Sequence, residues 1–284
     1  MKPIAAFQGE LGAYSELAAL EYFNREVTVL PMSTFAQVFD SVRSGEADNG
    51  VIPIENSLTG SIHDNYDLLL SHDLIIIGEI KLRIVQNLLV VPGTRLEEVR
   101  KIYSHPQALS QCKDFLSRLT EVDLVSVYDT AGAARKIMET GRREEAAVAS
   151  EQAALDYGLE ILKAGIESNH KNYTRFLVLS RGLAEKAEDS KTSIVFSTRN
   201  IPGALFKSLS VFALRDIDLY KIESRPIPGS PWEYMFYLDF QGDIRDEVSG
   251  RAIAHLEEIA SYLKVLGSYR KGKEYTGHTQ ERRE

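Results

Sequence analysis

The sequence predicts an α/β fold in two parts, and three observations support this prediction. Short apolar runs alternate with amphipathic runs over residues 1–182, a pattern typical of parallel sheets covered by helices on both faces. A polar, charged stretch at 183–191 has no periodicity of a buried element and indicates a linker. Residues 192–270 carry the order βαββαβ, which is typical of a ferredoxin-like fold.

The apolar runs of the first part give its strands in chain order. The first is followed by an amphipathic run at 15–24, and the second by another at 34–44, so each strand is expected to lead into a helix. Strands are expected at 4–7, 27–30, 50–54, 74–78, 87–91, 101–104, 124–128, 146–150 and 176–180.

The second part is shorter and begins and ends with a strand. A Pro-Gly pair at 202–203 opens its first helix, and a second Pro/Gly turn joins its two central strands. Residues 271–284 are charged and lack apolar positions, so we expect a disordered tail there. The expected strands are 192–197, 218–225, 232–241 and a short one near Val265, and the second helix is 247–263.

Charge and cysteine content exclude several classes of partner and site. The 284 residues include 33 Lys and Arg against 41 Asp and Glu, a formal charge of −8, which argues against nucleic acid or an anionic membrane as partner. The single cysteine, Cys112, excludes an internal disulfide and a thiolate metal cluster. With no run of 18 apolar residues and no signal-peptide core, we expect a cytoplasmic protein.

Polar segments follow several of the predicted strands. They lie at 9–15, 55–60, 104–107 and 129–131, where helices are expected to begin. Helix N-termini present unpaired N–H groups and the positive end of a dipole, so several of them around one cleft would bind a small carboxylated or phosphorylated ligand. The alternative is that each segment only caps its helix.

Two of the candidate segments carry side chains that suit carboxylate and hydroxyl groups. Gln107 and Gln111 are four residues apart, on one face of a helix that begins beside Ser104. Residues 172–176 offer a hydroxyl, a guanidinium and an aromatic ring, and arginine binds carboxylates through two hydrogen bonds. The alternative for the glutamine pair is an exposed helix face, and the alternative for residues 172–176 is a surface salt bridge.

Nucleotide, hydrolase and metal motifs are missing from the sequence. It has no GxGxxG motif, no Walker loop and no GxSxG elbow. The six histidines are scattered, and His63 and His72 match no standard metal-ligand spacing. We therefore expect neither a metal nor an organic cofactor.

Taken together, six segments give the sequence a resemblance to one enzyme family. It resembles the monofunctional prephenate dehydratases that carry a C-terminal ACT regulatory domain, over essentially the whole chain to about residue 270. The segments that carry the resemblance are Gly9 to Ser15, Ala47 to Ser57, Ser104 to Leu109, Asn172 to Phe176, Gly203 to Leu205 and Glu223 to Pro226.

The resemblance implies a two-lobed catalytic domain, shaped like a periplasmic binding protein, over residues 1–182. Lobe one would hold about 1–80 and 164–182, lobe two about 81–163, and the substrate prephenate would bind in the cleft between them. The reaction would release water and CO2 to give phenylpyruvate, which makes the enzyme a carbon-oxygen lyase (hydro-lyase, EC 4.2.1.51) of phenylalanine biosynthesis that needs no cofactor. The ACT domain would occupy 192–270.

Roles for individual residues follow from the same resemblance. Thr174 would donate a hydrogen bond to the departing hydroxyl, Arg175 would anchor a substrate carboxylate, and Phe176 would give an apolar wall that promotes loss of CO2. Because threonine is a weak acid, water, Glu55 or His105 remain possible proton sources. The residues expected to orient the substrate are Asn56, Ser104, Gln107 and Gln111, with support from Glu55, Ser57, Thr130 and Asn172.

Regulation is implied for the second part of the chain. Gly203, Ala204 and Leu205 would form one side of an L-phenylalanine site between two ACT domains, in a dimer or tetramer. The other side would hold Glu223, Ser224, Arg225 and Pro226. Three alternatives stay open: a plain dimerisation module, the same chemistry on arogenate, which has an amino group in place of the side-chain ketone, and a non-enzymatic binding or sensing protein.

Overall fold

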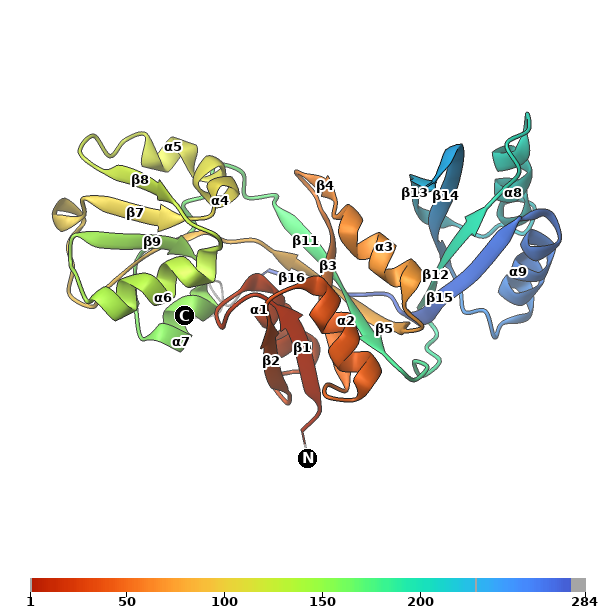
Figure 1. Cartoon of the computed structure of the whole chain (residues 1–284), viewed down its shortest axis with the longest axis horizontal. Helices are drawn as coiled ribbons and strands as arrows, with labels where there is room; N and C mark the ends of the chain where they lie inside the picture. Colours follow the sequence, from red (N-terminus) through yellow and green to blue (C-terminus); the bar gives the residue numbers. More distant parts are fainter. Residues whose placement is uncertain (1, 228, 277–284) are drawn as a thin grey trace. The chain divides into compact units, whose positions relative to one another are not determined.

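The computed structural model describes residues 2–227 and 229–276, which fall into two compact units (Figure 1). Of the described residues, unit 1 holds 2–65, 80–176 and 274–276, and unit 2 holds 66–79 and 177–273. The described strands form three sheets, of which the second lies wholly in unit 1 and the third in unit 2. None of the described helices is both long enough and apolar enough to span a lipid bilayer.

The first sheet contains strands from both ends of the chain and defines lobe one. Its order is β16-β5-β11-β3-β1-β2, with β4 paired to β3, and β1 runs parallel to both β2 and β3. The helices of this region are α1 (Tyr14–Tyr22), α2 (Phe35–Ser44) and α3 (His63–Ser71). The strands are β1 (Ile4–Gln8), β2 (Thr28–Met32), β3 (Asn49–Asn56), β4 (Gly60–Ser61), β5 (Ile75–Arg83), β11 (Tyr173–Ser180) and β16 (Glu274–Tyr275).

The second sheet defines lobe two and has the order β10-β6-β9-β7-β8. The chain enters it directly from β5 through 84–86 and returns to β11 through 164–172. The sequence predicted parallel sheets, but β6 pairs antiparallel with both β9 and β10, so this sheet is mixed. The elements are β6 (Asn87–Val90), η1 (Leu96–Glu98), β7 (Lys101–Ser104), α4 (Pro106–Gln111), α5 (Lys113–Leu116), β8 (Asp123–Ser126), α6 (Thr130–Thr140), β9 (Glu145–Ala149), α7 (Glu151–Tyr157) and β10 (Glu160–Lys163).

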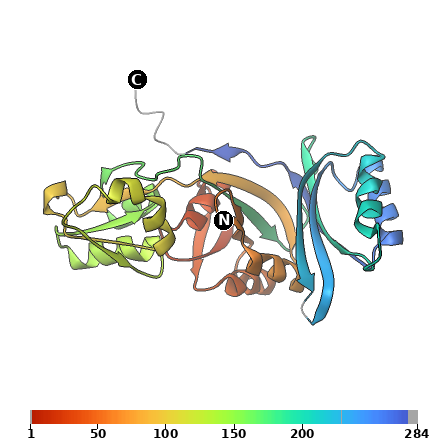
Figure 2. The same ribbon diagram turned by 90° about the horizontal axis from the view of Figure 1, so that it is seen from above.

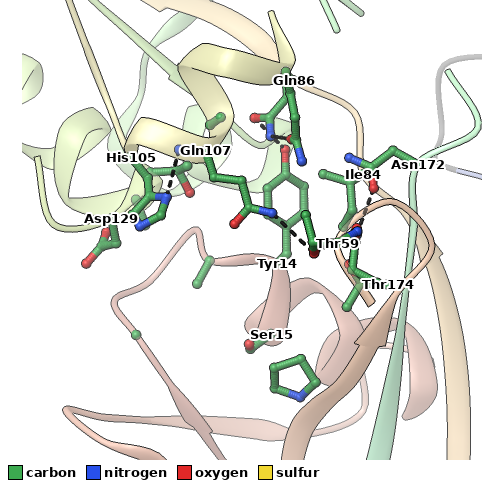
Figure 3. Close-up of a pocket in the computed structure, with 18 of the residues that line it drawn as sticks. Tyr14, Ser15, Thr59, Ile84, Gln86, His105, Gln107, Asp129, Asn172 and Thr174 are labelled. Carbon is green, nitrogen blue, oxygen red and sulfur yellow. Dashed lines mark hydrogen bonds between the residues drawn. The ribbon is translucent and has the colours of Figure 1, made fainter. Parts of the chain in front are cut away.

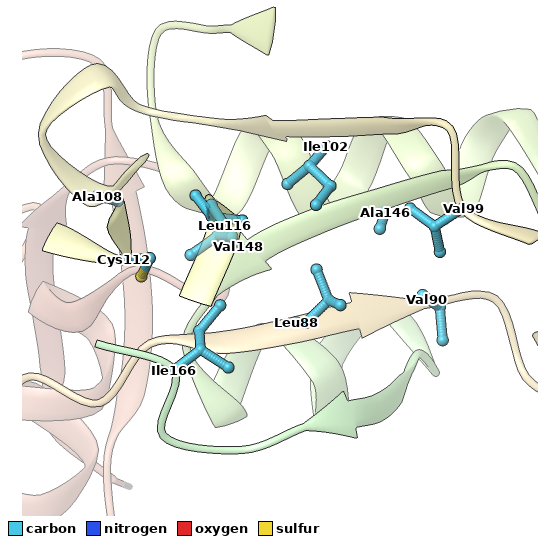
Figure 4. Close-up of a cluster of buried hydrophobic side chains, with 10 residues drawn as sticks. All are labelled: Leu88, Val90, Val99, Ile102, Ala108, Cys112, Leu116, Ala146, Val148 and Ile166. Atoms are coloured by element: carbon cyan, nitrogen blue, oxygen red, sulfur yellow. The ribbon is translucent and has the colours of Figure 1, made fainter. Parts of the chain in front are cut away.

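An aliphatic cluster fills one face of the second sheet (Figure 4). Leu88, Ile102 and Val148 come from three neighbouring strands, and all three are fully buried. Cys112 is part of this cluster, and burial raises the pKa of its thiol to about 12. This cysteine is therefore a core residue rather than a reactive thiolate at neutral pH.

The third sheet confirms the predicted βαββαβ order. Its strands follow the order β13-β14-β12-β15, and the cluster around Phe212 and Phe240 joins it to two helices. Figure 2 shows both helices on one side of this sheet. The elements are β12 (Ser190–Ser197), α8 (Ala204–Ala213), β13 (Leu219–Ile227), β14 (Ser230–Gln241), α9 (Glu247–Ile259) and β15 (Tyr262–Arg270).

Polar contacts tie the third sheet to the 66–79 segment of the same unit. The buried Lys191 Nζ lies 2.9 Å from Glu79 Oε2, and Tyr237 donates a hydrogen bond of 2.9 Å to the carbonyl of Tyr66. Lys264 Nζ donates to the carbonyls of Leu69 and His72, at the C-terminal end of α3, where a cation is stabilised by the helix dipole. The end of α3 and the start of β5 therefore belong structurally with the C-terminal domain.

Four boundaries differ from the sequence prediction. The second helix of this part ends at Ile259, and the final strand is a nine-residue element rather than a short one near Val265. Lys191, expected in the linker, is a buried strand residue. Glu274–Tyr275, expected in a disordered tail, form a strand along β5, since pairing at a sheet edge needs only backbone groups; residues 277–284 of that tail lie outside the described residues.

Candidate active site

A cleft of about 330 Å³ opens in unit 1 between the two lobes (Figure 3). Its walls come from the C-terminal ends of β1, β3 and β7, from the start of β11, and from the segments that follow these strands, where open α/β sheets bind ligands. The residues that line it are Gln8, Gly9, Ala13, Tyr14, Ser15, Pro53, Asn56, Thr59, Ile62, Ile84, Gln86, His105, Gln107, Ala108, Gln111, Asp129, Thr130, Ala131, Asn172, Thr174 and Phe176.

Asn56 organises the lobe-one wall. Its Oδ1 accepts hydrogen bonds from the backbone N–H groups of Leu58 and Thr59, at 3.0 and 3.1 Å. These two donors fix the amide orientation, because only the oxygen can accept. Asn56 Nδ2 must then face the opposite way, where it donates to Thr174 Oγ1 at 2.9 Å and to Asn172 Oδ1 at 2.7 Å.

This arrangement sets the direction of the Thr174 hydroxyl. Its oxygen already accepts from Asn56, so its own proton is available for another acceptor. Thr174 is 8% exposed and lines the cleft, as does Phe176 two residues along the same strand. The wall therefore presents an O–H donor beside an apolar ring.

Asn172 adds a second donor to the same wall. It is 1% exposed, its Oδ1 accepts from Asn56, and its Nδ2 has no hydrogen-bond partner among the described residues. A buried N–H without a partner costs free energy, so a bound group that accepts from it gains affinity.

Neutral polar groups form part of the lobe-two wall. Gln107 Nε2 approaches Thr59 Oγ1 at 3.4 Å, and Gln111 Oε1 accepts from Gln86 Nε2 at 3.2 Å. His105 Nδ1 accepts from the backbone N–H of Gln107 at 3.2 Å, so in the neutral imidazole the proton lies on Nε2. These amide groups can orient hydroxyl and carboxylate groups without carrying a charge, and the one carboxylate of this wall among the described residues is Asp129, at the start of α6.

Tyr14 and Gln86 contribute to the site although no reasoning from the sequence singled them out. The Tyr14 hydroxyl donates to the carbonyl of Val85 at 2.7 Å and lies 3.0 Å from Gln86 Oε1. Burial raises the pKa of this phenol well above its usual range, so it remains protonated. Tyr14 lies in one of the polar segments of the sequence, whereas Gln86 has no such signal.

Two helix N-termini point into the cleft, as the sequence predicts. Ala13, Tyr14 and Ser15 line it at the start of α1, and Thr130 and Ala131 line it at the start of α6. No Lys or Arg is among the lining residues that the structure describes. Anionic groups in this cleft are therefore stabilised by backbone N–H groups and helix dipoles rather than by a side-chain cation.

A tight contact joins the lobes beside the cleft. Gly12 has a φ of +87°, and a Cβ built on it would lie 2.6 Å from the Cα of Ala153 in α7, so only glycine fits. Ser150 donates a 2.6 Å hydrogen bond to the carbonyl of Gly12. Burial raises the pKa of nearby Glu16 to about 7, and the charge of Asp156 acts in the same direction.

Four residues predicted for the site lie outside the cleft lining. Arg175 is buried on the other face of β11, because side chains alternate along a strand, and its Nη1 lies 3.4 Å from Glu55 Oε1. Ser104 is fully buried and donates to the carbonyl of Val148 at 2.6 Å. Ser57 bonds the backbone of Lys171 and of Tyr173. The four residues are Glu55, Ser57, Ser104 and Arg175, and each makes contacts within the protein and does not line the cleft.

The corrected position of Arg175 predicts what its removal does. Arg175→Met is expected to lower the free energy of unfolding by about 1–3 kcal/mol, because a buried hydrogen-bonded cation is lost. The KM of the folded variant for substrate should change by less than about threefold, since Arg175 does not line the cleft. Urea denaturation and steady-state kinetics measure the two quantities. A large rise in KM with unchanged stability would mean that Arg175 does bind a substrate carboxylate.

Residues predicted for regulation fall at two places in unit 2. Gly203, Ala204 and Leu205 line a separate cavity of about 210 Å³, together with Trp232 and Tyr234. Glu223, Ser224, Arg225 and Pro226 lie on β13 and do not line that cavity. Arg225 instead lies 2.6 Å from Asp67 of α3. Within one chain the two motifs therefore do not form one site.

Comparison with known proteins agrees with this architecture. Residues 5–183 match the family model described as prephenate dehydratase. Arogenate dehydratase/prephenate dehydratase 2, a chloroplastic protein of Arabidopsis thaliana, is 48% identical over 276 residues, covering 93% of this chain and 72% of the relative.

Two solved structures are also similar. Prephenate dehydratase from Arthrobacter aurescens in complex with L-Phe is 32% identical with a TM-score of 0.85, covering 94% of this chain and 89% of the other. A protein described as GqqA, a novel type of quorum quenching acylase, is 37% identical with a TM-score of 0.87, covering 94% and 98%.

One expectation from the sequence is corrected by these relatives. A cytoplasmic location was expected, yet the similar Arabidopsis thaliana enzymes are chloroplastic. The expected cytoplasmic location is therefore wrong by this comparison.

Proposed function

Since the chain belongs to the prephenate dehydratase family, we propose that it catalyses the decarboxylating dehydration of prephenate to phenylpyruvate. The bond between the ring and its hydroxyl breaks, and the ring carboxylate leaves as CO2. The electron pair of the broken C–C bond enters the ring, which becomes aromatic. One proton is consumed as the hydroxyl departs as water, so the site must supply a donor at that oxygen.

The observation that carries this proposal is the hydrogen bond from Asn56 to Thr174. It occupies the Thr174 oxygen and leaves the hydroxyl proton for the departing group. The three-member chain of Asn172, Asn56 and Thr174 holds this donor in place before substrate binds, which lowers the cost of orienting it. Of the other candidate proton sources, His105 lines the cleft and Glu55 does not. His105 lies across the cleft from Thr174, so a proton from it would reach the departing hydroxyl through water.

Loss of CO2 is assisted by the apolar part of the cleft. Phe176 is 2% exposed, and Pro53, Ile62 and Ile84 line the same cavity. These side chains hold back the water that would solvate the ring carboxylate, and a less solvated carboxylate leaves more readily. The ring hydroxyl and the two ring substituents lie at opposite ends of the substrate. With the hydroxyl on Thr174, the three-carbon side chain extends toward the N-termini of α1 and α6, and the ring carboxylate on the same ring carbon faces the apolar side chains.

Arogenate is the second candidate substrate, favoured by the name of the Arabidopsis relative. The same bond changes convert arogenate to phenylalanine. Incubation of the purified chain with each substrate in turn, with phenylpyruvate and phenylalanine measured by chromatography, tests the proposal. We expect product from at least one substrate; its absence with both would leave a binding or sensing protein.

We also propose feedback by L-phenylalanine at the ACT-like domain of unit 2. The support is the cavity lined by Gly203, Ala204 and Leu205, and the L-Phe complex of the Arthrobacter aurescens relative. A second copy of the chain would bring the Glu223 to Pro226 motif to this cavity. Feedback then requires that phenylalanine bind the active and inactive conformations with different affinity.

Leu205→Asn tests this regulation. Leu205 is 36% exposed, so a polar side chain is tolerated, but its apolar contact with a phenyl ring is lost. We expect the phenylalanine concentration for half inhibition to rise roughly tenfold, with basal turnover unchanged. Ser210→Ala, on the same helix but outside the cavity, serves as the control. Undiminished inhibition of Leu205→Asn would move the site elsewhere.

A further inference from the structure

The end of the cleft away from Thr174 carries a negative side chain that dehydration itself does not need. Figure 3 shows Asp129 and His105 on one side of the cleft and Thr174 and Asn172 on the other, with Tyr14 between them. Asp129 is the one carboxylate among the described residues that line the cleft. A dianionic substrate such as prephenate gains nothing from it, since like charges repel.

Asp129 has one oxygen available. It is the N-cap of α6, and its Oδ1 accepts from the backbone N–H of Gly132 at 2.5 Å. Its second oxygen, Oδ2, has no hydrogen-bond partner in the part of the chain that the structure describes. Capping therefore uses half of the carboxylate and leaves the other half for a donor.

The next two residues, Thr130 and Ala131, offer hydrogen-bond donors instead of an acceptor. The backbone N–H groups of Thr130 and Ala131 have no hydrogen-bond partner among residues 2–227 and 229–276, and both residues line the cleft. A carboxylate that accepts from them lies at the positive end of the α6 dipole. The negatively charged Asp129 Oδ2 and the N–H donors of Thr130 and Ala131 are therefore neighbours. The carboxylate oxygen can accept from an ammonium group, and the two N–H groups can donate to a carboxylate on the same substrate carbon.

A second carboxylate, that of Glu10, lies near Asp129. Glu10 lies close enough to Asp129 that the two carboxylates interact, and its Oε2 is buried with no hydrogen-bond partner among the described residues. Burial, together with the charge of Asp129, raises the pKa of Glu10. Arg135 lies 2.9 Å from Glu10 Oε1 and is shared with Glu139 at 3.7 Å. The Arg135 guanidinium is thus shared by the carboxylates of Glu10 and Glu139, and the Asp129 carboxylate lies near that of Glu10.

We propose that Asp129 is a specificity-determining residue that binds the side-chain ammonium of the substrate, while the Thr130 and Ala131 N–H groups bind its carboxylate. The inference rests on the proposed dehydratase function and extends it to substrate choice. A ketone at the same position only accepts hydrogen bonds and leaves Asp129 without a donor. Of the two candidate substrates of the proposed dehydratase, the side-chain end of the cleft therefore favours arogenate, the amino form, and this inference places it ahead of prephenate.

The test is Asp129→Asn, assayed with both substrates. Asparagine caps helices about as well as aspartate, so the fold is retained while the charge is removed. We expect kcat/KM for arogenate to fall roughly 10- to 100-fold, as for loss of a charge-assisted hydrogen bond, and kcat/KM for prephenate to stay level or rise. The selectivity ratio between the two substrates is the quantity measured.

Asp114→Asn is the matched control. It removes the same charge from an exposed position in the same lobe, outside the cleft, and should leave both kcat/KM values unchanged. If Asp129→Asn lowers kcat/KM equally for both substrates, the residue acts only as a helix cap. An unchanged ratio would mean that it does not touch the side chain. Either result overturns this inference alone, whereas a wild-type chain inactive on both substrates overturns the dehydratase proposal.

Discussion

Thr174→Val is expected to lower kcat at least about 100-fold with little change in substrate binding. Valine has nearly the shape of threonine but no hydroxyl, so the variant loses the donor that the wall presents to the departing group. Binding is retained because the helix N-termini, Gln107 and Phe176 remain in place. Turnover is followed by product formation, and substrate affinity by calorimetry with the inactive variant.

Folding of this variant needs its own check. Thr174 is 8% exposed, and its loss leaves one bond of Asn56 Nδ2 unmade, while the bond to Asn172 remains. Thermal unfolding should therefore shift only modestly. A folded Thr174→Val enzyme with near-normal turnover would remove the hydroxyl from the mechanism.

Asn56→Asp is expected to be almost as damaging, for a different reason. The introduced carboxylate still accepts from the N–H groups of Leu58 and Thr59, but it cannot donate to Thr174. The Thr174 hydroxyl would then donate its proton to this carboxylate rather than to the substrate. We expect kcat to fall roughly 100-fold, measured in the same assay as for Thr174→Val.

A matched variant separates hydrogen-bond polarity from added charge. Ser57→Asp places a carboxylate one residue along the chain, at a side chain that does not line the cleft. If the added charge alone were harmful, Ser57→Asp and Asn56→Asp would lose similar turnover. We expect Asn56→Asp to be the far slower of the two, and equal rates would contradict the assigned direction of the Asn56 to Thr174 bond.

Much of the site could be predicted from the sequence because its residues sit where strands end. Asn56 ends β3 and Gln107 follows β7, and the C-terminal ends of parallel strands are where such sheets bind ligands. Thr174 lies instead at the start of β11, so its position beside Asn56 comes from the tertiary structure. The wrong predictions concern which side chains of a correctly chosen segment face the cleft. Arg175 was grouped with Thr174, although alternation along a strand sends adjacent side chains to opposite faces.

Other parts of the site required the tertiary structure. Gln86 lies in the short connection between the lobes, and only the approach of Tyr14 and Gln111 makes it part of the cleft. The role of Asp129 beyond capping depends on which cavity α6 faces, and a cap pattern in the sequence does not state that. The Glu274–Tyr275 strand depends on a free edge of β5, which hydrophobic periodicity does not reveal.

The central claim is that the Thr174 hydroxyl serves the departing group, and the comparison of Thr174→Ser with Thr174→Val tests it most directly. Serine keeps the hydroxyl, so its kcat with the better substrate should stay within about tenfold of wild type, while valine stays near or below about 1%. Two variants that are equally slow, or equally active, would contradict this account.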